Sequence, residues 1–232
     1  MRKGIFHIHS TFSYDGLNSI NSIFRFIKKH NLDFAVITDH DTIKGSIKLA
    51  EMVKKNGLKV EVPIAAEYKT NRGDIIVVNI RNEITEMNWE SFVKEVRLQN
   101  GFIILPHPYD GHTNIDELAL EVDAIEVFNG RSSLVNNFKS YLLSMKYDKP
   151  KIWASDAHIN SSLRKVIIGF DKNYSKFEEA VLSNQVIPLR SISCSFLDVF
   201  LSQFKRGIVQ KNFKLLFYLF YKLFFGRFIK SS

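Results

Sequence analysis

The segment "GIFHIHSTFSYDG", residues 4–16, sets two histidines one residue apart within a short apolar run. On a β-strand this spacing puts His7 and His9 on the same face, about 7 Å apart along the strand. On a helix the two side chains would point away from each other. Two neighbouring imidazoles are either a coincidence or a pair of metal ligands, and the motifs further along the chain distinguish these readings.

Length and composition limit the kinds of protein that this chain can be. The chain has 232 residues, of which 45% are hydrophobic and 24% charged, which suits one large α/β domain or two small ones. The single cysteine, Cys194, excludes a disulfide within the chain, and we expect a reducing, cytoplasmic location. We expect no secretory signal at the N-terminus, and no stretch reaches the roughly 18 apolar residues of a membrane span.

The positive charge is concentrated near the C-terminus. Residues 1–195 carry 25 Lys and Arg against 23 Asp and Glu, whereas residues 196–232 carry seven against one. The basic character therefore belongs mostly to the tail, and net charge alone does not indicate a nucleic-acid binder. We expect a catalytic domain over 1–195 and an amphipathic helical tail over 196–232.

Short apolar runs alternate with helical patterns along residues 1–195. The strands are predicted at 4–9, 34–38, 61–66, 75–80, 102–105, 124–128, 151–154 and 165–170. The helices are predicted at 19–30, 43–56, 88–100, 114–121, 133–147 and 175–184. This alternation predicts an α/β fold with parallel strands and helices outside, and it fits a closed barrel and an open sheet equally well.

Side chains of the types that bind metals follow the predicted strands. They are His7, His9, Asp15, His40, Glu67, His107, Asp156 and His158. The carboxyl ends of strands are where barrels and open sheets build their sites. Converging acids and imidazoles need cations to offset their repulsion, and this mixture of ligands suits Zn²⁺, Mn²⁺ or Fe²⁺. Two or three such ions can bind a phosphate ester and activate a water.

Five motifs in this order carry a family resemblance: "HIHSTFSYDG", "ITDHDT", "AAE", "LPHP" and "ASDAH". Together they resemble the PHP family (polymerase and histidinol phosphatase) over roughly residues 4–170. The resemblance implies a distorted (β/α)7 barrel with a trinuclear metal site. It also implies phosphoester hydrolysis by a metal-bound hydroxide, without a serine or cysteine nucleophile.

The resemblance also implies a division of the ligands. His7, His9, Glu67 and Asp156 would hold one ion. Glu67 would bridge to a second ion held by His107, and Asp15, His40 and His158 would hold a third. Many members supply a further histidine from the fourth strand, but here that strand reads "GDIIVVNI", where Asn79 is the nearest polar candidate. We therefore expect two to three divalent ions.

Other polar residues near strand ends suggest supporting roles. Arg131 and Arg164 are candidates for contact with a substrate phosphate, or else for surface salt bridges. Asn129 is a candidate for positioning Arg131 or substrate. Asp39 and Asp41 are expected to orient metal-binding histidines or to cap a helix, and Asp110 with His112 to form a surface turn.

The leading functional hypothesis is a metal-dependent phosphoesterase acting on a phosphorylated small molecule or nucleotide. One alternative is an amidohydrolase-like metal hydrolase. Another is a degenerate metal-binding regulatory domain without catalysis, which the missing fourth-strand histidine would favour.

The tail suggests a separate contact. On a predicted helix over 208–230, Lys211, Lys214 and Lys222 share one side, while phenylalanines and leucines cover much of the rest. An aromatic face beside a basic face is typical of a helix lying in the membrane interface. The alternatives are packing on the protein's own barrel or on a second subunit, and nucleic-acid binding through base stacking.

Overall fold

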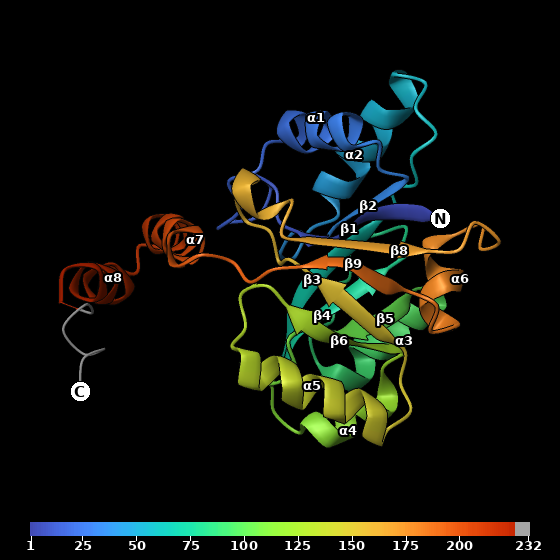
Figure 1. Cartoon of the computed structure of the whole chain (residues 1–232). Helices are drawn as coiled ribbons and strands as arrows, with labels where there is room; N and C mark the ends of the chain where they lie inside the picture. Colours follow the sequence, from blue (N-terminus) through green and yellow to red (C-terminus); the bar gives the residue numbers. More distant parts are fainter. Residues whose placement is uncertain (226–232) are drawn as a thin grey trace.

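Nine strands of the described residues, 1–225, pair as two sheets in the computed structural model (Figure 1). One sheet has the order β2-β1-β8-β9, and the other has the order β3-β4-β5-β6-β7. The strands are β1 (Arg2–Ile8), β2 (Phe34–Ile37), β3 (Ala65–Thr70), β4 (Gly73–Val78), β5 (Phe102–Leu105), β6 (Ala124–Asn129), β7 (Lys151–Ala154), β8 (Val166–Phe170) and β9 (Ile187–Ser191).

Strand pairing is mixed, so the α/β class is confirmed but the expectation of uniformly parallel strands is wrong. β1 pairs with β2, β5 with β6 and β6 with β7 in parallel, whereas the β3–β4, β4–β5, β1–β8 and β8–β9 pairs are antiparallel. Among the described residues no continuous ladder joins the two sheets, although an isolated parallel bridge between Ile8 and Ala157 links the end of β1 to the segment after β7. The isolated parallel bridge between His40 and Glu67 links β2 to β3 across the gap between the sheets.

Helices cover the outer faces of both sheets (Figure 1). They are α1 (Ile20–His30), α2 (Lys44–Lys55), α3 (Trp89–Leu98), α4 (Ile115–Glu121) and α5 (Leu134–Lys146). In contrast, α6 (Phe177–Leu182) packs into the core between the sheets, and a short 3-10 turn η1 (Asn160–Ser162) follows β7. α1 shows why they form: the Ser19 side chain accepts a hydrogen bond from the Ser22 amide, and the apolar face packs inward.

Two strands differ from their predicted positions. β3 begins at Ala65 and runs to Thr70, so Glu67 lies within the strand rather than at its end. A tight turn leads directly into β4, and Gly73 has a φ of 126°, which favours glycine. β9 escaped prediction because all five of its residues are exposed and it contains Pro188, so it shows no alternation of apolar and polar residues.

Between the sheets lies an aromatic core that fixes the first strand. The Phe6 and Phe177 rings lie 5.7 Å apart between centroids, and the Phe34 and Phe170 rings lie 5.2 Å apart. All four side chains are almost completely buried. Because β1 is clamped by this packing, the side chains that follow Phe6 are held in place.

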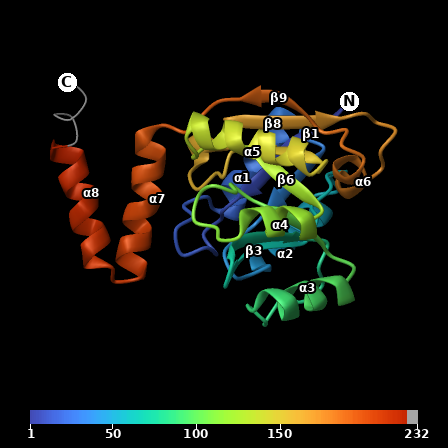
Figure 2. The same ribbon diagram turned by 90° about the horizontal axis from the view of Figure 1, so that it is seen from below.

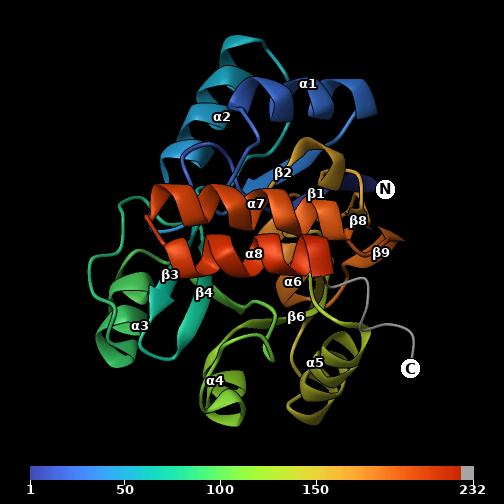
Figure 3. The same ribbon diagram turned by 90° about the vertical axis from the view of Figure 1, so that its left-hand side faces the viewer.

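The tail forms a helical hairpin beside the α/β body (Figures 2 and 3). It consists of α7 (Phe196–Val209) and α8 (Phe213–Phe225), which pack antiparallel. Gly207 lies inside α7, and a Cβ there would lie 2.6 Å from Leu216 of α8, so glycine permits the close packing. Residues 226–230 of the predicted 208–230 helix lie outside the described residues.

Neither helix of the hairpin meets the requirements for a transmembrane segment. Across residues 1–225, no helix combines the length and the apolar character that crossing a bilayer demands.

Candidate metal centre

A pocket of about 300 Å³ opens beside the carboxyl ends of β1, β2, β5, β6 and β7. His7 and His9 are 0% exposed and lie beneath the lining, next to Glu67 and Asp156. Its lining comprises Tyr14, Asp15, His40, Glu67, Lys69, Asp74, His107, Asp110, Asn129, Arg131, Ser132, Asp156, His158, Val199, Gln203 and Arg206. The structure thus brings all eight candidate ligands together from both sheets.

His7, His9 and Asp156 form one group with ligand spacing beneath the pocket, and Glu67 lies beside its two histidines. The Nε2 atoms of His7 and His9 lie 3.1 Å apart. Glu67 Oε2 lies 3.4 and 3.2 Å from these two nitrogens, and Asp156 Oδ1 lies 3.6 and 3.4 Å from them. A tetrahedral ion with ligand distances of about 2.0–2.2 Å separates its ligand atoms by about 3.3–3.6 Å. The spacings among His7, His9 and Asp156, and those from Glu67 to the two histidines, are therefore in the range expected for ligands of a divalent cation.

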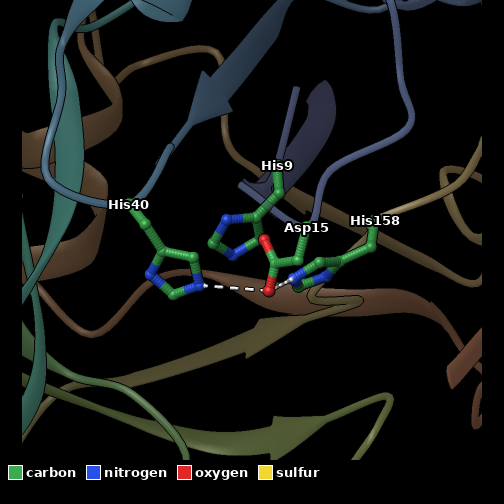
Figure 4. Close-up of side chains that lie close together, drawn as sticks. All are labelled: His9, Asp15, His40 and His158. Atoms are coloured by element: carbon green, nitrogen blue, oxygen red, sulfur yellow. Dashed lines mark ion pairs between the residues drawn. The ribbon is translucent and has the colours of Figure 1, made fainter. Parts of the chain in front are cut away.

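A second group of side chains gathers around Asp15 (Figure 4). Asp15 Oδ2 lies 3.5 Å from His40 Nε2 and 3.1 Å from His158 Nε2. His9 completes the group, since its ring lies 4.5 Å from that of His40 and 4.0 Å from that of His158. A short loop after β1 carries Asp15 back over the strand ends.

Glu67 is shared between neighbouring groups. Its Oε1 atom lies 3.2 Å from His107 Nε2, and its Oε2 atom lies 3.4 Å from His40 Nδ1. His7, Glu67 and His107 form a third cluster with ligand spacing. Because the Glu67 side chain is 1% exposed and faces histidines on several sides, it is placed to bridge ions.

Asp74 is the fourth-strand residue that faces the pocket. It lies at the start of β4, opposite Lys69 of β3. Burial and the neighbouring Glu67 carboxylate raise the pKa of Asp74 above its ordinary value. Asn79 lies beyond the other end of the strand and donates a hydrogen bond to Glu178, so it is not a ligand candidate. Sequence reasoning missed Asp74 because it sought a histidine.

Buried polar atoms without partners support the fit to metal ions. In the described residues, Asp15 Oδ1, Asp156 Oδ1 and His107 Nδ1 are buried and have no hydrogen-bond partner. An unsatisfied buried carboxylate oxygen is costly unless a cation or a donor compensates it. The donor set of imidazoles and carboxylates suits divalent transition metals.

Two opposing effects, burial and the charges of neighbouring side chains, set the pKa values in the cluster. Burial alone would lower the pKa of His7, but the carboxylates of Asp156, Glu126 and Glu67 raise it well above its ordinary value. Burial alone would raise the pKa of Glu67, but His7 and His40 hold it well below its ordinary value. The cluster therefore keeps its carboxylates ionised, which is the state that binds cations.

Glu126 holds two of the candidate ligands, and sequence reasoning missed it. Its Oε1 atom lies 2.8 Å from His7 Nδ1, and its Oε2 atom accepts hydrogen bonds from the His107 amide at 2.8 Å and from Asn129 Nδ2 at 2.9 Å. A carboxylate on the far nitrogen of a metal-binding histidine fixes the ring orientation. The available signal was an acid inside the apolar run "AIEVF".

Asp39 supports His9 indirectly. Its Oδ1 atom accepts a hydrogen bond from Ser13 Oγ at 3.0 Å, and Ser13 Oγ lies 3.1 Å from His9 Nδ1. Asp41 does not cap α2; its Oδ1 atom accepts a hydrogen bond from the Lys69 amide at 3.2 Å.

The loop after β5 is only partly the surface turn that was expected. Asp110 is exposed, but His112 is largely covered, and its Nε2 atom lies 2.6 Å from the Asp74 carbonyl oxygen. Burial lowers the pKa of His112 to about 4. His112 is therefore a neutral donor that ties this loop to β4 beside the pocket.

Three candidate ligands have left-handed backbone conformations. The φ angles are 61° for His7, 27° for His107 and 49° for Asp156. Non-glycine residues adopt such angles infrequently, and they persist where the surrounding structure holds them. The strand-end bends at these positions turn the side chains toward the shared centre.

The candidate phosphate contacts differ in position. Arg131 lines the pocket, where its guanidinium contacts His158 and lies 3.9 Å from Asp156 Oδ1. Asn129 Oδ1 accepts a hydrogen bond from the Arg131 amide at 2.8 Å, which fits a positioning role. Arg164 is exposed after η1 and is not among the residues that line the pocket.

The tail contributes a wall of the pocket, which the sequence did not indicate. Val199, Gln203 and Arg206 of α7 line it. The Arg206 guanidinium lies 5.6 Å from the centroid of the Tyr14 ring, and that ring stacks on His40 at 4.6 Å. The Arg206 guanidinium thus faces the cluster of candidate metal ligands from the side opposite the sheets.

Comparisons with known proteins agree with these motifs. Residues 6–185 match the family model described as the PHP domain. An uncharacterized protein of Methanocaldococcus jannaschii is 31% identical over 154 residues, which cover 58% of this chain and 87% of that protein.

Solved structures share the fold at low sequence identity. A two-domain protein of Bacteroides vulgatus containing a predicted PHP-like metal-dependent phosphoesterase superposes with a TM-score of 0.66 and 16% identity. The match covers 82% of this chain and 65% of that protein. An amidohydrolase of Chromobacterium violaceum, solved with sulfate and without metal, has a TM-score of 0.58 and 14% identity, covering 80% of this chain and 97% of that one.

Proposed function

Because the chain belongs to the PHP domain family, we propose that it is a metal-dependent phosphoesterase. The observation that carries the proposal is the sharing of Glu67 and His9 between adjacent ligand groups beneath a pocket bordered by Arg131 and Arg206. Adjacent divalent ions bind the oxygens of a phosphate ester, lower the pKa of a bound water and offset charge on the leaving oxygen. We also propose that the two sheets together correspond to the distorted (β/α)7 barrel that the family resemblance implies.

The ions would be Zn²⁺, Mn²⁺ or Fe²⁺, two or three in number. His7, His9, Glu67 and Asp156 would hold the first. Asp15, His40 and His158 would hold another beside His9, and His107 with Glu67 would hold the remaining one, with Asp74 as the acid closest to that position on β4.

The protein's own residues would bind and orient the substrate. Arg131 and Arg206 enter the pocket from different elements, the segment after β6 and helix α7. Guanidinium groups hydrogen-bond phosphate oxygens strongly, so the two side chains together would fix the phosphate over the cluster. Asn129 would hold the Arg131 backbone in place.

The volume of the pocket limits the size of the substrate. A volume of about 300 Å³ lies at the lower end for small-molecule sites. It suits a phosphorylated small molecule or a single nucleotide, of which the phosphate and its immediate substituent enter the pocket. Hydrolysis of an amide is the alternative reaction, but an amide substrate carries no anionic group that would need two arginines at the pocket wall.

One screen tests the proposal. Purified protein would be assayed with phosphomonoesters, phosphodiesters, short oligonucleotides and cyclic amides, with the metal content of the same sample measured by mass spectrometry. We expect turnover of a phosphate ester that rises with added Mn²⁺ and falls at least about a hundredfold in Glu67→Gln, which loses the bridging charge. Turnover of amides alone would point to an amidohydrolase. Bound metal without any turnover would point to a regulatory domain.

A further inference from the structure

We propose that the α7–α8 hairpin is a docking surface for an anionic lipid bilayer. The proposal concerns the face of the hairpin that points away from the α/β body (Figures 2 and 3). It goes beyond the hydrolytic function and does not depend on it. In this arrangement the helices would lie on the lipid surface without crossing it.

The outer face of α8 exposes large aromatic side chains. Phe213 is 75% exposed and Phe217 is 76% exposed, and their four-residue spacing puts them on the same side of the helix. Leu219 is buried and Leu216 packs against Gly207, so α8 contacts α7 through a different side of the helix. The exposed phenylalanines are therefore not needed to hold the hairpin together.

The tip of the hairpin combines apolar and basic side chains. Ile208 is 55% exposed and Val209 is 53% exposed at the end of α7, next to Lys211 and Lys214. A single acid, Asp198, occurs in residues 196–232, and it is buried against the body rather than on the outer face. A surface that is apolar and basic, with no acid of its own, complements anionic headgroups.

Charge favours lipid over a second copy of this chain as the occupant. In a symmetric dimer through this face, the same patch would meet itself, so Lys211 and Lys214 would face the like charges of the partner. An anionic bilayer instead accepts the phenylalanines in its interface and the lysines among its headgroups.

Docking would bring the catalytic pocket close to the lipid. The inner face of α7 carries Lys205, which donates hydrogen bonds to the carbonyl oxygens of Ser13 and Gly16, and Arg206, which lines the pocket. Since α7 lies between α8 and the body (Figure 2), the outer face of α8 would rest on the membrane about two helix diameters away, roughly 20 Å.

Vesicle sedimentation tests the proposal with the full-length protein. The vesicles would be phosphatidylcholine alone and phosphatidylcholine with phosphatidylglycerol in equal parts. We expect binding to the anionic vesicles at least about tenfold tighter than to the neutral ones, and weakened by salt. Lys211→Gln with Lys214→Gln should weaken binding about fivefold for each lysine removed. Phe213→Ser with Phe217→Ser should reduce it by about tenfold or more.

A matched control removes an exposed aromatic residue elsewhere. Phe138 on α5 is 63% exposed, and Phe138→Ser should leave vesicle binding unchanged while circular dichroism confirms that every variant is folded. Equal, negligible sedimentation with both vesicle types would overturn the proposal. A dimer that Phe213→Ser with Phe217→Ser converts to a monomer, or binding to single-stranded oligonucleotides without binding to vesicles, would also overturn it.

Discussion

His7 Nδ1 lies 2.8 Å from Glu126 Oε1, and both side chains are completely buried. The other carboxylate oxygen of Glu126 accepts two hydrogen bonds, from the His107 amide and from Asn129. One acid thus fixes a ligand from β1, a ligand after β5 and a pocket residue of β6. This places Glu126 in the support of the metal centre rather than among its ligands.

Replacing Glu126 by Gln should lower metal affinity about 10- to 100-fold. The amide offers one acceptor oxygen, so its NH₂ group would face a donor where the carboxylate accepted a hydrogen bond. Metal content after dialysis, measured by mass spectrometry, tests this together with a titration of Mn²⁺ into the metal-free variant. Retention of metal equal to that of the wild type would show that Glu126 only fills space in the core.

Removing the metal should destabilise the fold. Chelation would leave Glu67, Asp156 and Asp15 clustered without their cations, and the ordinary linkage of binding to folding would be lost. At a hundredfold excess of metal over its Kd, this linkage corresponds to a fall in Tm of roughly 5–10 °C for a chain of this size. Differential scanning calorimetry with chelator, and then with Mn²⁺ restored, measures it. An unchanged Tm would contradict a bound ion that bridges the two sheets.

Most of the candidate ligands could be picked out from the sequence because they follow apolar runs. Six of the eight lie within four residues of a strand end, whereas Glu67 lies inside β3 and Asp15 lies in the loop after β1. The supporting residues were less predictable. Glu126 lies inside a strand, and its partners, such as His7 Nδ1, come from elements far apart in the chain. Arg206 reaches the pocket only through the docking of a helix that the sequence presents as a separate tail.

The strand directions were less predictable than the strands. Periodicity reports which residues face the core, but it does not report whether the next strand returns beside its neighbour or crosses over. β4 and β5 are antiparallel although α3 separates them, and β8 returns antiparallel to β1 from the far end of the domain. These pairings depend on tertiary packing, which is why the alternation of strands and helices led to an incorrect expectation of parallel sheets.

Arg206 and Arg131 should govern substrate binding. Replacing either by Ala removes a charge-assisted hydrogen bond to phosphate, and we expect kcat/KM for the best phosphate ester to fall about 10- to 100-fold. The metal content should stay unchanged, because neither side chain belongs to the ligand groups. Arg164→Ala is the control, since that side chain is exposed outside the pocket. Equal losses in all three variants would indicate a general effect of charge rather than a phosphate site.

Cys194 should react slowly with thiol reagents. Burial raises the pKa of its thiol to about 11, and the Sγ atom lies 3.4 Å from the Ser155 carbonyl oxygen. Because the thiolate is the reactive form, alkylation by iodoacetamide at pH 8 should be about two orders of magnitude slower than for an unperturbed cysteine. Mass spectrometry follows the adduct, with protein unfolded in urea as the reference. Comparable rates in the folded and unfolded protein would show that the thiol is accessible.

The attachment of α7 should depend on the ionisation of Asp198. Burial alone would raise the pKa of Asp198, but the hydrogen bonds from Ser161 Oγ and Ser195 hold it below its ordinary value of 3.8. The Ser161 bond spans 2.6 Å and joins the helix to the body, while the Ser195 amide donates at 2.7 Å within the cap of α7.

Because the pKa of Asp198 is lower in the folded state than in the unfolded state, ionised Asp198 stabilises the fold. This stabilisation is complete when the pH is above the ordinary carboxyl pKa, and it is lost as the pH falls through the folded-state pKa. Asp198→Asn should therefore cost about 1 kcal/mol of stability at neutral pH. The difference in stability between wild type and variant should shrink as the pH drops below 3.8. Denaturant unfolding at a series of pH values measures that difference, and since other carboxylates titrate equally in both proteins, they cancel. A difference that stays constant down to the acid limit would show that Asp198 holds α7 as a neutral group.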